Sequence, residues 1–380
     1  MKIHSRLPDV GTSIFTVMSK MALDCGAINL SQGFPDFMID EKIISLVHRY
    51  MLEGNNQYAP MPGTPVLRNA IAGVIAKTYG RVVDPETEIT VTAGATESTF
   101  SVIAALISSG DEVIVFDPAY DSYNPVVRLN GGIPIHINLN EADFSIDWVV
   151  VRSRITSRTK MIIINTPHNP SGAVLREKDL QELEKIVVEH NLLVLSDEVY
   201  ERLIFDDMPH QSVLRYPALA EQSLAVFSFG KTFHATGWKV GYVTAPAYLT
   251  REVRRAHQFV VFSVNTPVQL ALAEYLQNPE HYLSLGNFYQ QKRDFFLTQI
   301  KGSSFEPMPC HGSYFQLLSY KNISTKTDVA MAEELTKKFK VASIPVSVFY
   351  QDKTDNRLLR FCFAKKEETL EKACVILRSL

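Results

Sequence analysis

The stretch KMIIINTPHNPSGAVLREKDLQELEKIVVEHNLLVLSDEVY, residues 160–200, decides the fold. Residues 160–165 are apolar on both faces, as strands buried inside a parallel sheet are. Residues 176–190 carry apolar side chains at helical spacing, and residues 192–197 form a second apolar run. A strand, a helix and another buried strand in this order predict an α/β unit with parallel strands.

The same alternation continues on both sides of this stretch. Further strands are expected at 88–92, 112–116, 133–137 and 224–229, with helices at 96–108 and 122–129. These segments extend the unit into an α/β domain with a mostly parallel sheet.

The pattern changes beyond about residue 267, where long amphipathic helices alternate with isolated strands such as 358–363. This mixture is typical of an α+β arrangement. We therefore predict a large domain at 41–268 and a smaller α+β domain built from 1–40 and 269–380. The first 40 residues are expected to be irregular and to wrap against the smaller domain.

Composition excludes several classes of protein. The 380 residues carry a formal net charge of −3, which argues against the basic surface of a nucleic-acid binder. The four cysteines form no CxxC pair and no cluster with metal-ligand spacing, so we expect reduced thiols and no metal. The N-terminal sequence lacks the pattern of a signal peptide, and no apolar run approaches about 18 residues. We expect a cytoplasmic protein that does not bind membranes.

Polar side chains follow the predicted strands, where open α/β sheets bind their ligands. Gly94, Ala95 and Thr96 open a helix, and exposed amides at a helix start suit a phosphate. Taken alone, this turn is equally an ordinary helix cap, and so is Asp197. The other polar residues at strand ends are Tyr120, Asn169, Tyr200, Ser228, Lys231 and Lys239.

Lys231 stands out among these side chains. The triplet GKT at 230–232 suggests a P-loop, but the P-loop pattern needs glycine at position 225, where this chain has Ala225. Lys231 follows a buried strand and lies among glycines and aromatic residues. A lysine in such a partly desolvated place can form a Schiff base.

Four motifs now occur in order: the Gly-Ala-Thr turn at 94–96, NPSG at 169–172, DEVY at 197–200 and SFGKTFHATGWKVG at 228–241. The chain resembles the class I/II pyridoxal-phosphate (PLP) aminotransferases of fold type I along essentially its whole length. LSQGFPDF at 30–37 and LRFCF at 359–363 resemble the family's substrate motifs. SQGFPDF, QYAPMPG and FSVNTP look closest to methionine aminotransferases and to kynurenine and glutamine transaminases. The resemblance implies a mostly parallel sheet with helices on both faces, plus the smaller domain.

The resemblance also implies a role for each cofactor residue. Lys231 forms the Schiff base with PLP and moves the substrate proton. Asp197 faces the pyridine nitrogen, Tyr200 binds the ring oxygen beside Asn169, and Tyr120 stacks on the ring. The phosphate is expected to contact Ala95, Thr96, Ser228 and Lys239. Tyr58 resembles a tyrosine that reaches the phosphate of a neighbouring subunit, which implies a homodimer with shared active sites.

Substrate recognition is expected to use Arg360 for the α-carboxylate, assisted by Asn169 and the backbone of Gly33. The segment FVVFSVNTP at 259–267 offers apolar residues where aspartate-type relatives use a second arginine. Phe15, Tyr58 and Phe262 are candidates for an apolar pocket. We predict transfer of an amino group from an apolar, thioether or aromatic L-amino acid, with methionine favoured, to a 2-oxo acid by a ping-pong mechanism.

One rival function remains open at this point, and a second is disfavoured. A PLP-dependent C–S β-lyase acting on cysteine conjugates would keep the same cofactor residues, because the cofactor is the electron sink in both reactions. A ligand sensor without catalysis would need an added DNA-reading region, for which the chain has no room. Of the histidines, His190 and His257 are expected on helix surfaces.

Overall fold

A seven-stranded sheet forms the centre of the larger part of the computed structural model, which describes residues 4–380. Its strands are β2 Ile89–Thr92, β3 Glu112–Asp117, β4 Ile133–Asn138, β5 Thr159–Asn165, β6 Leu193–Asp197, β7 Ser223–Ser228 and β8 Gly241–Thr244. Their order is β2-β8-β7-β6-β5-β3-β4, and only β8 runs antiparallel to its neighbours β2 and β7. The predicted strands and the mostly parallel sheet are confirmed.

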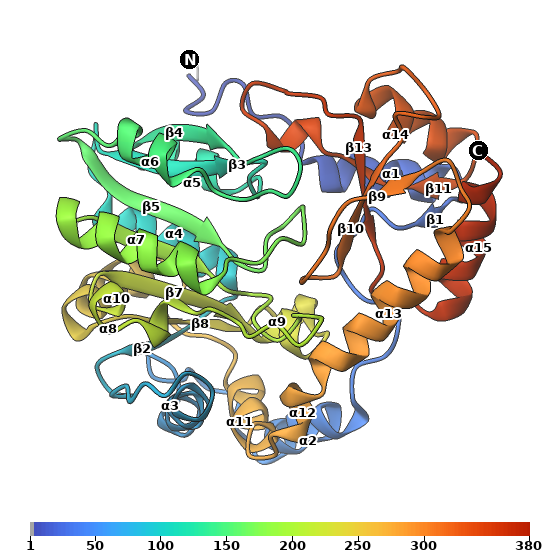
Figure 1. Cartoon of the computed structure of the whole chain (residues 1–380). Helices are drawn as coiled ribbons and strands as arrows, with labels where there is room; N and C mark the ends of the chain where they lie inside the picture. The colour runs from blue at the N-terminus through green and yellow to red at the C-terminus, as the bar shows by residue number, and fades with distance from the viewer. Residues whose placement is uncertain (1–3) are drawn as a thin grey trace.

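Helices cover both faces of this sheet (Figure 1). The helices of this larger part are α2 Glu41–Leu52, α3 Pro65–Tyr79, α4 Ala95–Leu106, α5 Tyr123–Leu129, α6 Trp148–Arg154, α7 Glu177–His190, α8 Pro217–Ala220, α9 Phe229–Thr232, α10 Ala247–Val260 and α11 Thr266–Tyr275. Alternate residues of β3 show the consequence: Val113 and Val115 belong to one buried cluster, whereas Ile114 belongs to another. A strand packed on both faces must be apolar throughout, which explains the continuous apolar runs of the sequence.

The smaller part combines both ends of the chain, and Figure 1 shows the blue N-terminal elements beside the red C-terminal ones. Its helices are α1 Ile14–Asp24, α12 Glu280–Leu283, α13 Leu285–Ile300, α14 Asp328–Lys337 and α15 Glu367–Arg378. Its strands are β1 Ile28–Asn29, β9 Glu306–Pro307, β10 Phe315–Ser319, β11 Val341–Ala342, β12 Ile344–Pro345 and β13 Leu358–Cys362. The order β12-β13-β10-β9 makes an antiparallel sheet, and β1 pairs in parallel with β11.

The N-terminal segment differs from the prediction, because α1 and β1 give it regular structure. The Ser13 side chain accepts a hydrogen bond from the Phe15 amide and caps α1. Met18 and Ala22 lie one turn apart on α1 and are both buried. The expectation of an irregular segment was therefore wrong, because a capped helix with a short apolar stripe was overlooked. Residues 1–3 of the predicted small domain lie outside the described residues.

The division between domains at residue 268 stays a prediction. That position lies inside α11, which packs against α2 and α3 of the larger part. The chain therefore continues as one helix through the predicted boundary.

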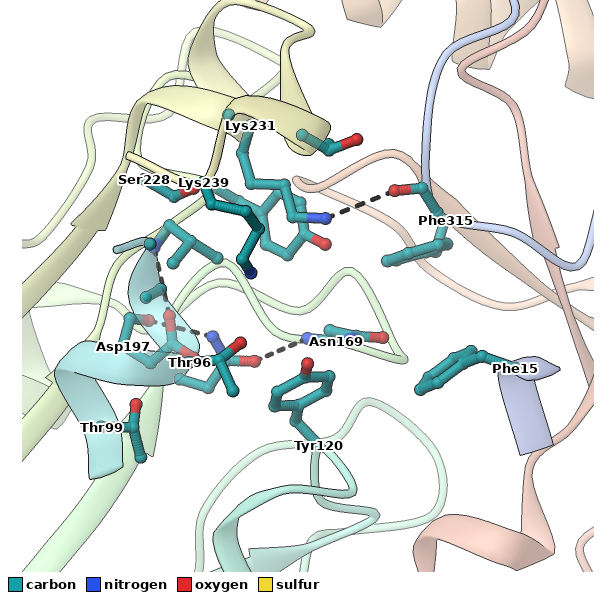
Figure 2. Close-up of a pocket in the computed structure, with 18 of the residues that line it drawn as sticks. Phe15, Thr96, Thr99, Tyr120, Asn169, Asp197, Ser228, Lys231, Lys239 and Phe315 are labelled. Atoms are coloured by element: carbon teal, nitrogen blue, oxygen red, sulfur yellow. Dashed lines mark hydrogen bonds between the residues drawn. The ribbon is translucent and has the colours of Figure 1, made fainter. Parts of the chain in front are cut away.

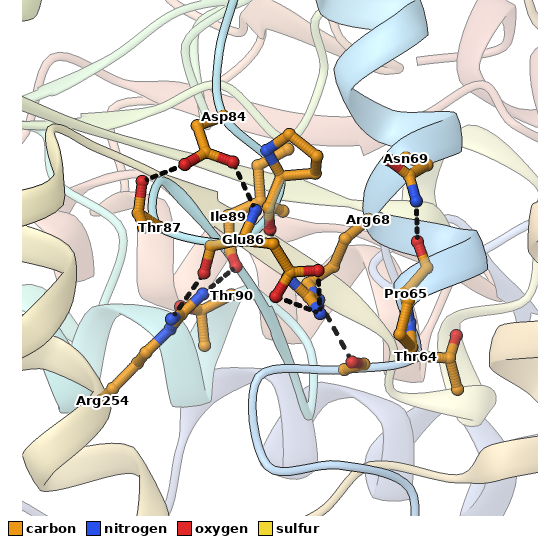
Figure 3. Close-up of polar contacts among 12 residues, drawn as sticks. Thr64, Pro65, Arg68, Asn69, Asp84, Glu86, Thr87, Ile89, Thr90 and Arg254 are labelled. Atoms are coloured by element: carbon orange, nitrogen blue, oxygen red, sulfur yellow. Dashed lines mark hydrogen bonds and ion pairs between the residues drawn. The ribbon is translucent and has the colours of Figure 1, made fainter.

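Two arginines fix the entry to β2 (Figure 3). Arg68 on α3 donates from Nε to the Gly63 carbonyl at 3.2 Å and pairs with Glu86 at 3.0 Å. Arg254 on α10 donates to the carbonyls of Glu86 and Ile89 at 2.8 and 2.7 Å. These contacts tie two helices to the start of the strand whose far end carries the Gly94 turn. Among residues 4–380, no helix is both long enough and apolar enough to cross a bilayer.

Candidate active site

A cavity of about 260 Å³ lies where the carboxyl ends of the parallel strands meet β10 and β13. Thirteen of the residues singled out in the sequence line it: Phe15, Gly33, Gly94, Ala95, Thr96, Tyr120, Asn169, Asp197, Tyr200, Ser228, Lys231, Lys239 and Arg360. Figure 2 shows Lys231 and Lys239 reaching into this cavity opposite Tyr120, with Phe15 and Phe315 at one end. Residues more than 300 positions apart in the chain thus form one site.

Lys231 lies on α9, immediately after β7. Its amine is 2.9 Å from the Tyr314 hydroxyl and 3.3 Å from the Gly33 carbonyl oxygen. Burial lowers the pKa of Lys231 to about 8, and the positive charges of Arg360 and Lys239 act in the same direction. Roughly a tenth of the amine is therefore unprotonated at pH 7, far more than for an exposed lysine, and the unprotonated form is what a nucleophile or general base requires.

Asp197 is the last residue of β6 and is buried. Its carboxylate accepts a hydrogen bond from the Tyr123 hydroxyl at 2.5 Å and another from the Val199 amide at 3.3 Å. Burial raises the pKa of Asp197 to about 6, and the bond from Tyr123 opposes this rise. These two bonds hold the carboxylate in one orientation. A cation bound next to it would stabilise its ionised form.

The turn after β2 has the features of an anion site. Gly94 has a φ of 83° and contributes no side-chain cap to α4, whose first residues Ala95 and Thr96 line the cavity. A methyl group at Gly94 would lie 3.4 Å from the Lys239 Nζ, so the lysine reaches over this turn. Uncapped amides at a helix start, next to an ammonium group, attract a phosphate.

Tyr120 and Tyr200 supply neutral phenols to the cavity. Burial raises the pKa of Tyr120 to about 12 and raises that of Tyr200 as well, so both hydroxyls keep their protons at neutral pH. The Tyr200 ring packs edge-on against Tyr314, with 5.0 Å between the ring centroids. This packing fixes the direction of the Tyr200 side chain.

Arg360 is a buried cation on β13. It donates to Asn169 Oδ1 at 2.7 Å and to the Ser31 carbonyl at 2.9 Å, while its Nε has no partner among the described residues. Burial lowers the pKa of Arg360 to about 10. Because both partners are neutral oxygens, the positive charge of the guanidinium is not neutralised and can pair with an incoming carboxylate.

Tyr58 and Phe262 lie outside this cavity. They pack edge-on against each other at 5.4 Å and are 83% and 50% exposed. Phe262 follows the end of α10 with a φ of 68°, which turns the chain toward Tyr58. Within one chain, the expected contribution of Phe262 to the substrate pocket is therefore not seen. The role predicted for Tyr58 concerns a second subunit, so one chain cannot display it.

His257 contradicts its prediction as a surface residue, because it is fully buried. One ring nitrogen lies 3.0 Å from Glu97 Oε1 and the other lies 3.2 Å from the Met61 carbonyl oxygen. The helix α10 packs on α4, so the face that carries His257 points inward. Through its contact with Glu97, His257 thereby links the start of α4, next to the Gly94 turn, to the loop that carries Tyr58.

Several contacts of the site were not anticipated, namely those of Tyr123, Tyr314 and Phe315. Tyr123 is the first residue of α5 and follows the loop that carries Tyr120. Tyr314 and Phe315 come from the smaller part, where Tyr314 immediately precedes β10 and Phe315 is its first residue. Their sequence neighbourhood contains no polar pattern that points to Lys231 or Arg360.

Comparisons with known proteins give a consistent picture. Residues 26–377 match the family model described as aminotransferase class I and II. The chain is 48% identical to a methionine aminotransferase of Escherichia coli over 99% of this chain and 98% of the relative. It is 34% identical to the mouse kynurenine–oxoglutarate transaminase 3, covering 100% of this chain and 90% of that one. A solved Escherichia coli structure, reported with a methionine aminotransferase function, matches with a TM-score of 0.98 at 48% identity, and both chains are covered completely.

Proposed function

Because the chain belongs to the class I and II aminotransferases, we propose that it binds PLP and transfers the amino group of an apolar, thioether or aromatic L-amino acid to a 2-oxo acid. Methionine is the favoured donor, in line with the 48% identity to the Escherichia coli methionine aminotransferase. The observation that carries the proposal is the convergence of the Lys231 amine, the Asp197 carboxylate and the Arg360 guanidinium on one cavity.

The residues present fit PLP. Asp197 provides a buried carboxylate for a pyridinium nitrogen, and the Gly94 turn with Ser228 and Lys239 provides donors for a phosphate. Tyr120 supplies an aromatic face, while Asn169 and Tyr200 supply neutral polar groups. When bound, PLP supplies an aldehyde carbon that takes the amino group and a ring that withdraws electrons from the substrate Cα.

Lys231 is the group that moves protons in this site. Its pKa of about 8 places it close to physiological pH, where a group can both accept and return a proton. We assign Lys231 the role of the base that would take the proton from the substrate Cα and return it later in the reaction. Asp197 keeps the ring nitrogen protonated, and a cation beside Asp197 lowers the pKa of this carboxyl in return.

Arg360 and the apolar lining select the amino donor. Among the cavity-lining residues of the described chain, the cationic side chains are Lys231, Lys239 and Arg360. Lys231 serves as the base, Lys239 binds the phosphate and Arg360 binds the α-carboxylate. No cation among the described lining residues then remains for a second substrate carboxylate. Phe15 and Phe315 line the same cavity, which favours a thioether or aromatic side chain over that of aspartate.

A second copy of the chain completes the proposed site. Tyr58, Phe259 and Phe262 form an exposed apolar surface on and beside the Tyr58 loop, and Phe259 is 87% exposed. Exposed aromatic residues of this kind are enriched in protein interfaces. We assign this surface to a homodimer in which Tyr58 reaches the phosphate of the partner subunit.

The decisive experiment combines spectroscopy with a panel of donors. PLP bound to the wild-type protein should absorb visible light at a wavelength that shifts on adding methionine, and Lys231→Ala should abolish turnover and the lysine-dependent band. Methionine with several 2-oxo acids should give the corresponding oxo acid of methionine and a new amino acid. An unchanged cofactor spectrum in Lys231→Ala would refute the assignment.

The same panel separates transamination from β-elimination. A cysteine conjugate incubated without any 2-oxo acid yields ammonia and pyruvate only if elimination dominates. Aspartate as the preferred donor in steady-state rates would overturn the apolar pocket. Oligomeric state, measured by light scattering on Tyr58→Ala and wild type, tests the shared site.

A further inference from the structure

Tyr314 contacts the amine of Lys231 although nothing in the reaction scheme above uses it. The residue precedes β10 and has 0% of its surface exposed. Its hydroxyl lies 2.9 Å from the Lys231 Nζ and also hydrogen-bonds the Gly33 carbonyl. Tyr314 thus bridges the lysine of the larger part and a backbone carbonyl of the N-terminal segment.

The direction of each bond follows from counting protons. A phenol has one proton, and a carbonyl oxygen can only accept, so Tyr314 donates to Gly33. Toward Lys231 the phenol oxygen must then accept, and Lys231 donates. Burial raises the pKa of Tyr314 well above its ordinary value, which keeps this proton in place. The phenol is therefore a fixed acceptor for the lysine amine.

Packing holds the Tyr314 ring in one position. Tyr200 and Phe315 lie edge-on to it, at 5.0 and 4.8 Å between ring centroids, and the tilted ring of Tyr289 lies at 5.9 Å. Gly33, whose carbonyl accepts the Tyr314 proton, is equally constrained. Its backbone lies so close to the Phe315 ring that an added Cβ would be only 2.7 Å from it. Neither end of the Tyr314–Gly33 hydrogen bond can move without displacing an aromatic ring.

The turn at residues 31–33 connects this tyrosine with the arginine that receives the substrate. The Ser31 carbonyl accepts a hydrogen bond from Arg360 at 2.9 Å, and the Gly33 carbonyl accepts one from Tyr314. Two residues of one short turn therefore set the position of Arg360 and of Lys231, which Gly33 contacts both through Tyr314 and directly at 3.3 Å. A shift of the turn changes the distance between these two functional groups.

We propose that Tyr314 is a positioning residue for the lysine base. Through the turn at residues 31–33, it keeps the Lys231 amine at a fixed distance and orientation relative to the Arg360 guanidinium. The proposal rests on the function proposed above, because it assigns Lys231 the proton transfer at the substrate Cα. Without the phenol oxygen, the amine rotates among more orientations and reaches the Cα proton less often.

Tyr314→Phe removes only the hydroxyl and keeps the ring that packs against Phe315. Tyr289→Phe is the matched control, since the Tyr289 hydroxyl is buried nearby and has no hydrogen-bond partner within residues 4–380. We expect Tyr314→Phe to lower kcat for methionine about tenfold to a hundredfold, with KM changed less than about threefold. Tyr289→Phe should keep the wild-type values.

Two further measurements separate positioning from a structural effect. Methionine deuterated at Cα should show a larger kinetic isotope effect in Tyr314→Phe, because proton transfer becomes more rate-limiting, whereas a smaller folded fraction leaves this ratio unchanged. The apoprotein of Tyr314→Phe should also capture PLP more slowly than the apoproteins of wild type and Tyr289→Phe, followed by absorbance.

The outcomes distinguish this proposal from the proposed function. An active wild-type transaminase with unaltered isotope effect and capture rate in Tyr314→Phe overturns the role of Tyr314 alone. A wild-type protein that transfers no amino group from any donor overturns the proposed function itself. Equal losses in Tyr314→Phe and Tyr289→Phe, with an unchanged isotope effect, assign both rings to packing and reject the proposal.

Discussion

The guanidinium carbon of Arg360 lies 3.8 Å from the centroid of the Phe315 ring. Both residues are buried, and they lie on the neighbouring antiparallel strands β13 and β10. The aromatic face stabilises a cation that has no carboxylate partner of its own among the described residues, and such contacts strengthen when water is excluded. Phe315 therefore keeps Arg360 charged and oriented while its Nε remains available.

Replacing this ring should weaken substrate binding. Phe315→Leu preserves an apolar side chain but removes the cation–π contact, which is worth about 1–2 kcal/mol in a desolvated site. We expect KM for methionine to rise about fivefold to thirtyfold, measured in steady-state assays at saturating 2-oxo acid. Phe296→Leu, a buried ring away from the cavity, is the control. Equal KM values in wild type and Phe315→Leu would contradict the contribution of the ring.

The bond from Tyr123 to Asp197 predicts a change in pH dependence. The Tyr123 hydroxyl donates to the carboxylate and lowers the pKa of Asp197, so Tyr123→Phe should raise this pKa further above about 6. The protonated carboxyl cannot stabilise a pyridinium, and activity should therefore be lost at a higher pH on the acid side. The measurement is kcat/KM against pH from 5 to 9 in both proteins. An acid limb that stays in place would show that Tyr123 does not influence the ionisation of Asp197.

Burial of Lys231 predicts how the apoprotein captures PLP. Capture requires the unprotonated amine, and a pKa lowered to about 8 makes that form abundant from about pH 8 upward. The rate of the absorbance change should therefore rise with pH and level off above about 8. An exposed lysine would level off near its ordinary pKa of about 10.4. A midpoint close to that value would show that Lys231 is more solvated than its contacts indicate.

The buried pair His257–Glu97 predicts an effect on stability. His257→Leu removes the polar ring that lies between Glu97 and the Met61 carbonyl and leaves a buried position without those hydrogen bonds, which costs about 2–4 kcal/mol of unfolding free energy. His257→Gln keeps one donor and should lose less. Urea unfolding of the three proteins, followed by fluorescence, gives the comparison. Identical midpoints would show that the pair contributes nothing to folding.

The strand pattern and the cofactor-type residues were readable from the sequence. Strands buried on both faces are continuous apolar runs, so β5, β6 and β7 are visible without any tertiary information. Asp197 and Lys231 directly follow such runs, and the carboxyl ends of parallel strands meet at one edge. The short strand β8 and the helix α1 carried weaker signals, because short elements depend on their neighbours for burial.

What the sequence alone determined was the α/β sheet and the set of polar residues at its strand ends, because local periodicity and strand direction suffice to place them. Only the tertiary structure decided which side chains complete the site. Tyr314, Phe315 and the buried His257 depend on packing between segments far apart in the chain, and no local pattern records such a contact. For the same reason, the role proposed for the surface of Tyr58 and Phe262 concerns a second copy of the chain and has no counterpart in a local sequence pattern.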